Sequence, residues 1–137
     1  MSDAMVPRPV LAVLSDLLFR SKIDEVARRL GLTLRVARSR EQLERHLATV
    51  SPSIALVDLE ESALDPSETI RRLKSLADPP RIIAFAGHTN VDAIRAGRDA
   101  GADAVLARSA FTAQLPRLLG EALPAASDHL PPPPNGT

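Results

Sequence analysis

Runs of consecutive apolar residues alternate along this chain with stretches in which apolar residues recur every three or four positions. The runs predict buried strands at residues 10–14, 54–58, 82–86 and 104–107, and a more alternating run predicts an edge strand at 33–37. A strand that is apolar at nearly every position is typical of a parallel sheet covered on both faces. We therefore expect the three most apolar runs to lie in the middle of one sheet.

The stretches between these runs have the 3.6-residue period of amphipathic helices, and polar residues precede several of them. Ser15 or Asp16 caps the first helix and Ser39 the second, while Pro66 starts the third. Ser109, like Ser15, is interpreted as a helix cap. The residues expected to face the core are Phe19, Ile23, Val26, Ala27, Leu30, Leu43, Leu47, Val50, Ile70, Leu73, Leu76, Val91, Ile94, Ala100, Phe111, Leu115, Leu118, Leu119 and Ala122.

Strict alternation of strands and helices with short loops predicts an α/β fold, a flavodoxin-like (βα)5 doubly wound parallel sheet. The strand order 2-1-3-4-5 places the most apolar runs centrally. We expect one domain at residues 9–123, a lead-in at 1–8 and a proline-rich, disordered tail at 124–137.

The amino-acid composition limits the classes of partner and site that this protein can be expected to have. Lys plus Arg and Asp plus Glu each total 17, so charge gives no reason to expect nucleic acid or a membrane surface as partner. The absence of cysteine excludes a disulfide framework and a thiolate metal site. No run approaches the roughly 20 apolar residues of a membrane span, and we expect a cytoplasmic location.

Asp58 is the first candidate for chemistry, because ligands of open α/β sheets bind beyond the carboxyl ends of the strands. It begins an acidic segment, since residues 46–70 contain no Lys or Arg but include Glu60, Glu61, Asp65 and Glu68. Such a loop is usually solvated, and the alternative is a metal site.

Asp58 at the end of the third strand, residues 101–103 (Gly-Ala-Asp) before the fifth strand, and residues 108–112 (Arg-Ser-Ala-Phe-Thr) after it together resemble the CheY-like receiver domains of bacterial response regulators. The resemblance covers residues 9–123. It implies that Asp58 is equivalent to the aspartate that a histidine kinase phosphorylates. In that family the reaction also uses an acidic pair that holds Mg²⁺, a Thr or Ser after strand four and a Lys after strand five.

This sequence departs from that set at each supporting position. The acidic pair falls at Leu14 and Ser15, which leaves Asp16 one position late. Ala86 replaces the hydroxyl residue and Arg108 replaces the Lys. Arg108 can hold a carboxylate through two parallel bonds, which favours a permanent pair with Asp58.

The leading hypothesis is therefore a pseudo-receiver that acts by protein–protein interaction, is not an enzyme, and uses no metal or other cofactor. The alternative is a working single-domain response regulator phosphorylated on Asp58 with Mg²⁺, held by Asp16, Asp58 and Glu60. The partner protein is unidentified. We expect the fourth helix, fifth strand and fifth helix to form the partner or homodimer face, where Ala93, Ala96 and Gly97 allow close approach.

Two further features have a structural and a functional interpretation. His88, in the loop after strand four, is a loop-lining residue or, less simply, a general base or pH switch. Residues 20–45 carry eight basic and four acidic side chains, which indicates a solvated face first and a docking patch for an acidic partner second. The basic residues are Arg20, Lys22, Arg28, Arg29, Arg35, Arg38, Arg40 and Arg45.

Overall fold

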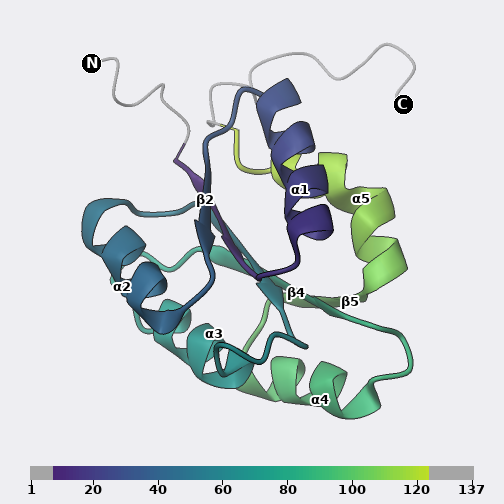
Figure 1. The fold of residues 1–137 in the computed structure, drawn as a ribbon. Coiled ribbons are helices and arrows are strands. Elements are labelled where there is room, and N and C mark those ends of the chain that lie inside the picture. The colour runs from purple at the N-terminus through teal and green to yellow at the C-terminus, as the bar shows by residue number, and fades with distance from the viewer. Residues whose placement is uncertain (1–7, 124–137) are drawn as a thin grey trace.

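A five-stranded parallel sheet runs through residues 8–123, the part of the chain that this computed structural model describes (Figure 1). Its strands are β1 (Val10–Val13), β2 (Leu34–Ala37), β3 (Ile54–Asp58), β4 (Arg81–Ala86) and β5 (Ala104–Ala107), in the order β2-β1-β3-β4-β5. Every neighbouring pair is parallel. The predicted fold class and strand order are confirmed. The expected tail at 124–137 and most of the lead-in lie outside the described residues.

Helices cover both faces of this sheet (Figure 1). Helices α1 (Leu17–Arg29) and α5 (Arg108–Gly120) lie on one face, and α2 (Arg40–Thr49), α3 (Pro66–Lys74) and α4 (Val91–Ala100) lie on the other. Within residues 8–123, no helix combines the length and the apolar character that crossing a membrane requires.

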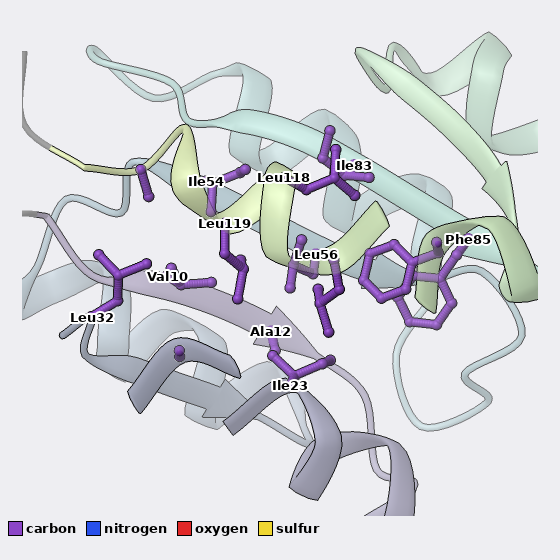
Figure 2. Close-up of a cluster of buried hydrophobic side chains, with 14 of the residues drawn as sticks. Val10, Ala12, Ile23, Leu32, Ile54, Leu56, Ile83, Phe85, Leu118 and Leu119 are labelled. Carbon is purple, nitrogen blue, oxygen red and sulfur yellow. The ribbon is translucent and has the colours of Figure 1, made fainter. Parts of the chain in front are cut away.

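Two apolar layers hold the helices to the sheet, because successive strand residues point to opposite faces. On β1, Val10 and Ala12 join the layer under α1 and α5, whereas Leu11 and Val13 join the layer under α2, α3 and α4. Figure 2 shows the first layer, in which Phe85 lies at one end of a row of aliphatic side chains. All five β3 residues are buried, as the uninterrupted apolar run predicts.

The structure confirms the predicted caps Asp16 and Ser39 and the start of α3 at Pro66, and it corrects three other expectations about the helices. The side chains of Asp16, Ser39 and Asp65 accept the capping bonds of α1, α2 and α3. Ser15 caps nothing, because Asp16 takes that position, and Ser109 lies inside α5, which has no side-chain cap. The third correction concerns α4, where Val91 was expected to face the core but is 58% exposed.

The sheet register brings three strand ends together. Asp58 lies beside Phe85 on β4, and Ala86 lies beside Ala107 on β5. Arg108 follows Ala107 directly as the first residue of α5. The carboxylate of β3 and the guanidinium of α5 therefore meet at the carboxyl edge of the sheet, where parallel α/β folds place their ligand sites.

Candidate functional site

Asp58 is a nearly buried carboxylate at the centre of this edge. Its side chain is 8% exposed. One oxygen, Oδ1, accepts a hydrogen bond from the backbone N–H of Glu60 at 2.9 Å. Burial raises the pKa of Asp58, although that N–H and the nearby Arg108 oppose the effect. The buried environment of Asp58 therefore disfavours the ionised form of its carboxyl group.

Arg108 is the cation of the site, but Asp58 is not its main partner. Its Nη2 donates to Glu60 Oε1 at 2.8 Å and to Asp58 Oδ1 at 3.4 Å. The expected pair of parallel bonds to Asp58 is therefore wrong, because one nitrogen serves two carboxylates. The guanidinium also lies 5.0 Å from the ring centroid of Phe19 and 5.2 Å from that of Phe85, within the range of cation–π attraction.

Glu60 accepts bonds from three donors in two separate segments, the loop after β4 and the start of α5. Its carboxylate accepts from Asn90 Nδ2 at 2.8 Å, from Arg108 at 2.8 Å and from the backbone N–H of Gly87 at 3.2 Å. These donors, in the same order, lower the pKa of Glu60. The side chain thereby links the loop after β3 to the loop after β4 and to the start of α5.

Glu61 makes a second tie, to the loop after β1. Its Oε1 accepts from both the backbone N–H and the hydroxyl of Ser15, each at 2.7 Å, and its Oε2 accepts from the N–H of Ala63 at 3.0 Å. Burial opposes ionisation of Glu61, but the bonds from Ala63 and Ser15 outweigh it and lower the pKa. Ser15 is therefore a partner of the acidic loop rather than a helix cap.

From the sequence, Glu60 and Glu61 were interpreted only as members of an acidic loop. Glu60 was also considered as an alternative metal ligand. Their partners Asn90, Gly87 and Ser15 lie 27 to 46 positions away, so no local spacing indicates the contacts. The available signal was the position of two acids directly beyond a buried strand end.

The other positions of the expected site are apolar or already engaged. Leu14 is fully buried in the core, and Ala86 is fully buried with no hydroxyl to offer. Asp16 is exposed, and its Oδ1 accepts the N–H of Phe19. Between residues 8 and 123, no group of three or more His, Asp or Glu side chains is arranged to hold a metal ion. The alternative set of Asp16, Asp58 and Glu60 is thus not assembled.

A mainly apolar hollow adjoins the site. It has a volume of about 580 Å³ and lies between the start of α5, the loop after β4 and Phe19 of α1. His88 is exposed at its rim, with Ser109 and Thr112 on the α5 side. The residues that line the hollow with His88 include the hydroxyls of Ser109 and Thr112, but no hydrogen bond joins either to His88 among the described residues, so no observation supports the general-base interpretation.

Several solved structures with the same architecture are response regulators. The receiver domain from Bermanella marisrubri superposes with a TM-score of 0.72 at 23% identity, over 83% of this chain and 96% of that one. A putative response regulator from Chloroflexus aurantiacus gives 0.73 at 21% identity, over 85% and 97%. This chain has the receiver fold. The resemblance drawn from residues 9–123 is thereby confirmed at the level of the fold.

Two further matches connect the receiver fold to signalling proteins. A Burkholderia pseudomallei response regulator, solved with a phosphorylated aspartic acid, a calcium ion and citrate, has a TM-score of 0.70 at 20% identity, over 88% of this chain and 69% of that one. The transcriptional activator protein ExaE of Pseudomonas putida is 30% identical over 83 residues, 61% of this chain. The chain spans about two fifths (39%) of the length of that activator. No protein-family model matches the chain.

Proposed function

We propose that this chain is a receiver-like signalling module of the cytoplasm, which acts by binding another protein and does not depend on phosphorylation of Asp58. It has no catalytic activity of its own. The observation that carries the proposal is the carboxylate of Glu60, which occupies Arg108, Asn90 and the N–H of Gly87. The donors at this edge of the sheet are already bound to an anion that belongs to the chain.

Charge balance supports the same proposal. A phosphoryl group adds about 1.5 to 2 negative charges near neutral pH. On Asp58 that charge would lie beside Glu60, with Arg108 as the only cation that contacts either carboxylate among the described residues. Separating Arg108 from Glu60 would leave the latter without its cationic partner. Such an addition is electrostatically unfavourable unless another cation enters.

Magnesium does not fit as that cation. The ion prefers near-octahedral oxygen ligands and gives up its water reluctantly, so one carboxylate makes a poor site. Asp16 caps α1, Leu14 is buried in the core and Glu60 is held by three donors. Asp58 has one oxygen that accepts no bond within residues 8–123, because only its Oδ1 is engaged, and a single carboxylate is a poor magnesium site.

The second candidate function is a working response regulator phosphorylated on Asp58 by a histidine kinase. One observation favours it, because Asp58 ends β3 at the carboxyl edge of a receiver fold and one of its oxygens has no partner within residues 8–123. This candidate requires Glu60 to release Arg108 and a metal to be recruited from solution.

The test adds Mg²⁺ with acetyl phosphate, or with beryllium fluoride, to the purified chain. We expect no phosphoryl adduct by intact mass and no movement of the amide signals of Ala86 and Val105. A phosphorylatable receiver treated in parallel shows that the reagents are active, and Asp58→Asn should bind the partner as the wild type does. A stoichiometric adduct on Asp58, with amide shifts that spread to β4 and β5, would establish the working regulator instead.

For the interaction surface we propose the face made by α4, β5 and α5. Arg95, Ala96 and Arg98 are exposed on α4 and free to contact a partner protein or a second copy of the chain. Gly97 does not belong to this surface, contrary to the expectation from sequence. It is buried, and a Cβ at this position would lie 2.9 Å from both Leu59 methyl carbons, so its small size serves packing inside the molecule.

A further inference from the structure

The outer edge of β2 is open. Strand β2 pairs with β1 alone, through bonds in which the carbonyls of Thr33 and Ala37 accept from β1. Because peptide groups alternate in direction along a strand, those of Leu34 and Val36 point away from the sheet. The contact of His46 Nε2 with the carbonyl oxygen of Val36 at 3.0 Å agrees with that direction. The N–H groups of Leu34 and Val36 have no partner among residues 8–123.

Two hollows adjoin one another along this edge. The edge itself lies between α1 and α2 (Figure 1). One of about 330 Å³ extends toward α2, and one of about 310 Å³ extends toward α1. They share Arg20 and Val36 in their walls, so together they form an elongated depression, which we call the β2 groove. Leu17 and Leu34 add apolar surface at the α1 end.

The charge of the β2 groove is positive and uncompensated. Arg20, Arg38 and Arg45 line it, and none forms an ion pair with any residue in the described range. Its single acidic lining residue, Asp24, is paired with Arg28 at 3.0 Å. Three guanidinium groups without internal partners favour an anionic ligand, since each offers several donors in a planar array.

We propose that the β2 groove binds an extended acidic segment of a partner protein, which adds as a strand beside β2. Backbone pairing through the N–H groups of Leu34 and Val36 supplies affinity, with the carbonyl of Val36 kept by His46, and carboxylates of the segment reach Arg20, Arg38 and Arg45. The two adjoining hollows and the two free N–H groups favour an extended chain over a compact anion. This site lies on β2, α1 and α2, away from Asp58, so it does not rest on the function proposed above.

The test uses capped seven-residue peptides in which valine alternates with glutamate or, as a control, with lysine. We expect the glutamate peptide to shift the amide signals of Leu34, Val36 and Arg38, and the lysine peptide to leave them unchanged. Methylating the central peptide nitrogens should weaken binding about tenfold or more, because the strand bonds are lost while the charges remain.

The variant Arg38→Glu with Arg45→Glu should weaken binding of the glutamate peptide about tenfold or more. The control with the same change in charge is Arg95→Glu with Arg98→Glu, on α4, and circular dichroism shows whether each variant is folded. Binding that maps elsewhere, that is equally sensitive to both pairs of substitutions, or that is absent at millimolar peptide would overturn the proposal. If inorganic phosphate shifts the same amide signals with equal affinity, the β2 groove is a site for compact anions and the proposal of an extended segment is wrong.

Discussion

Asp58 illustrates a residue whose chemistry is determined by burial more than by its cationic neighbour. Its pKa is raised above the ordinary value of 3.8, first by burial, so its ionised form is disfavoured in the folded state. The unfolded chain therefore loses the proton more easily than the folded chain. This cost to stability is absent below the unfolded pKa and grows as pH rises through the folded pKa.

We therefore expect Asp58→Asn to be more stable than the wild type at pH 7, by on the order of 0.5–1 kcal/mol. The amide keeps an oxygen that can accept from the N–H of Glu60. Urea unfolding from pH 3 to pH 8 measures the difference, which should vanish at the acidic end. Asp99→Asn, on the exposed side of α4, is the control and should show no such trend. A destabilised Asp58→Asn at pH 7 would contradict this account of the site.

The shift in the pKa of Glu61 has the opposite sign to that of Asp58, so ionisation of Glu61 stabilises the folded protein. Its pKa lies below the ordinary value of 4.5, so its ionised form stabilises the folded state. That contribution is fully present above the unfolded pKa and is lost as pH falls through the folded pKa. Glutamine places an NH₂ group where Ser15 or Ala63 needs an acceptor.

We expect Glu61→Gln to lower the free energy of unfolding at pH 7 by about 1–2 kcal/mol. Hydrogen exchange at the Ser15 and Ala63 amides should accelerate, because both N–H groups bond to this carboxylate. The difference in stability should shrink below pH 4.5. Glu41→Gln, an exposed change on α2, should stay within about 0.5 kcal/mol of the wild type. Equal effects of the two substitutions would show that the tie to Ser15 contributes nothing.

At the scale of elements, the sequence predicted the strands and most helix faces because their signals are local. An uninterrupted apolar run identifies a buried strand, and all β3 residues are indeed buried. Val91 shows where such reasoning fails. It lies nine positions before Ala100, which at about 100° per residue places it on the opposite side of α4. With Ala100 buried against the sheet, Val91 is directed to solvent.

The contacts of the candidate site had no comparable local signal. Asp58 and Arg108 could be paired from sequence, because parallel strands in the predicted order end at one edge. The preference of Arg108 for Glu60 could not be predicted from the sequence, because it depends on the path of the loop after β3. A side chain two residues beyond a strand end can point to either side, and only the folded loop decides.

Helix ends provide the third prediction. Gly101 closes α4 at φ 108°, a left-handed conformation that side chains with a Cβ rarely adopt. Gly101→Ala should destabilise the protein by about 1–2 kcal/mol. Gly120→Ala, at the end of α5, meets no atom within 4 Å and should be neutral or stabilising, by up to about 1 kcal/mol. Thermal unfolding of both variants measures the contrast, and similar midpoints would contradict it.

For the whole molecule, the two proposed surfaces lie on different elements of one sheet. The β2 groove is at one outer strand and the face of α4, β5 and α5 is at the other. The hydrogen bonds of Glu60 and Glu61 connect the loops after β1, β3 and β4 with one another and with the start of α5. These ties agree with the proposed module, which would present fixed surfaces and would not alternate between two states. Phosphorylation of Asp58 shifts an equilibrium between two conformations only if the phosphoryl group interacts differently with each of them.

The last prediction tests the face of α4, β5 and α5 through self-association. Arg95 and Arg98 are exposed on α4 without ion pairs in the described part of the chain. If two copies meet there, the mass measured by sedimentation should rise with concentration above 14.7 kDa. Reversing both charges should weaken that association about tenfold or more, because the charges then clash with a partner surface that fits the native ones.

The matched control is Arg38→Glu with Arg45→Glu in the β2 groove, which changes the net charge equally and should leave self-association unchanged. The two double variants thus serve as controls for one another, since each should affect one kind of binding only. A chain that is monomeric at millimolar concentration, or a mass that responds equally to both pairs of substitutions, would show that α4 does not join two copies. The same variants would then be compared for binding to a protein partner, where loss of affinity specific to Arg95 and Arg98 would assign the face to that partner.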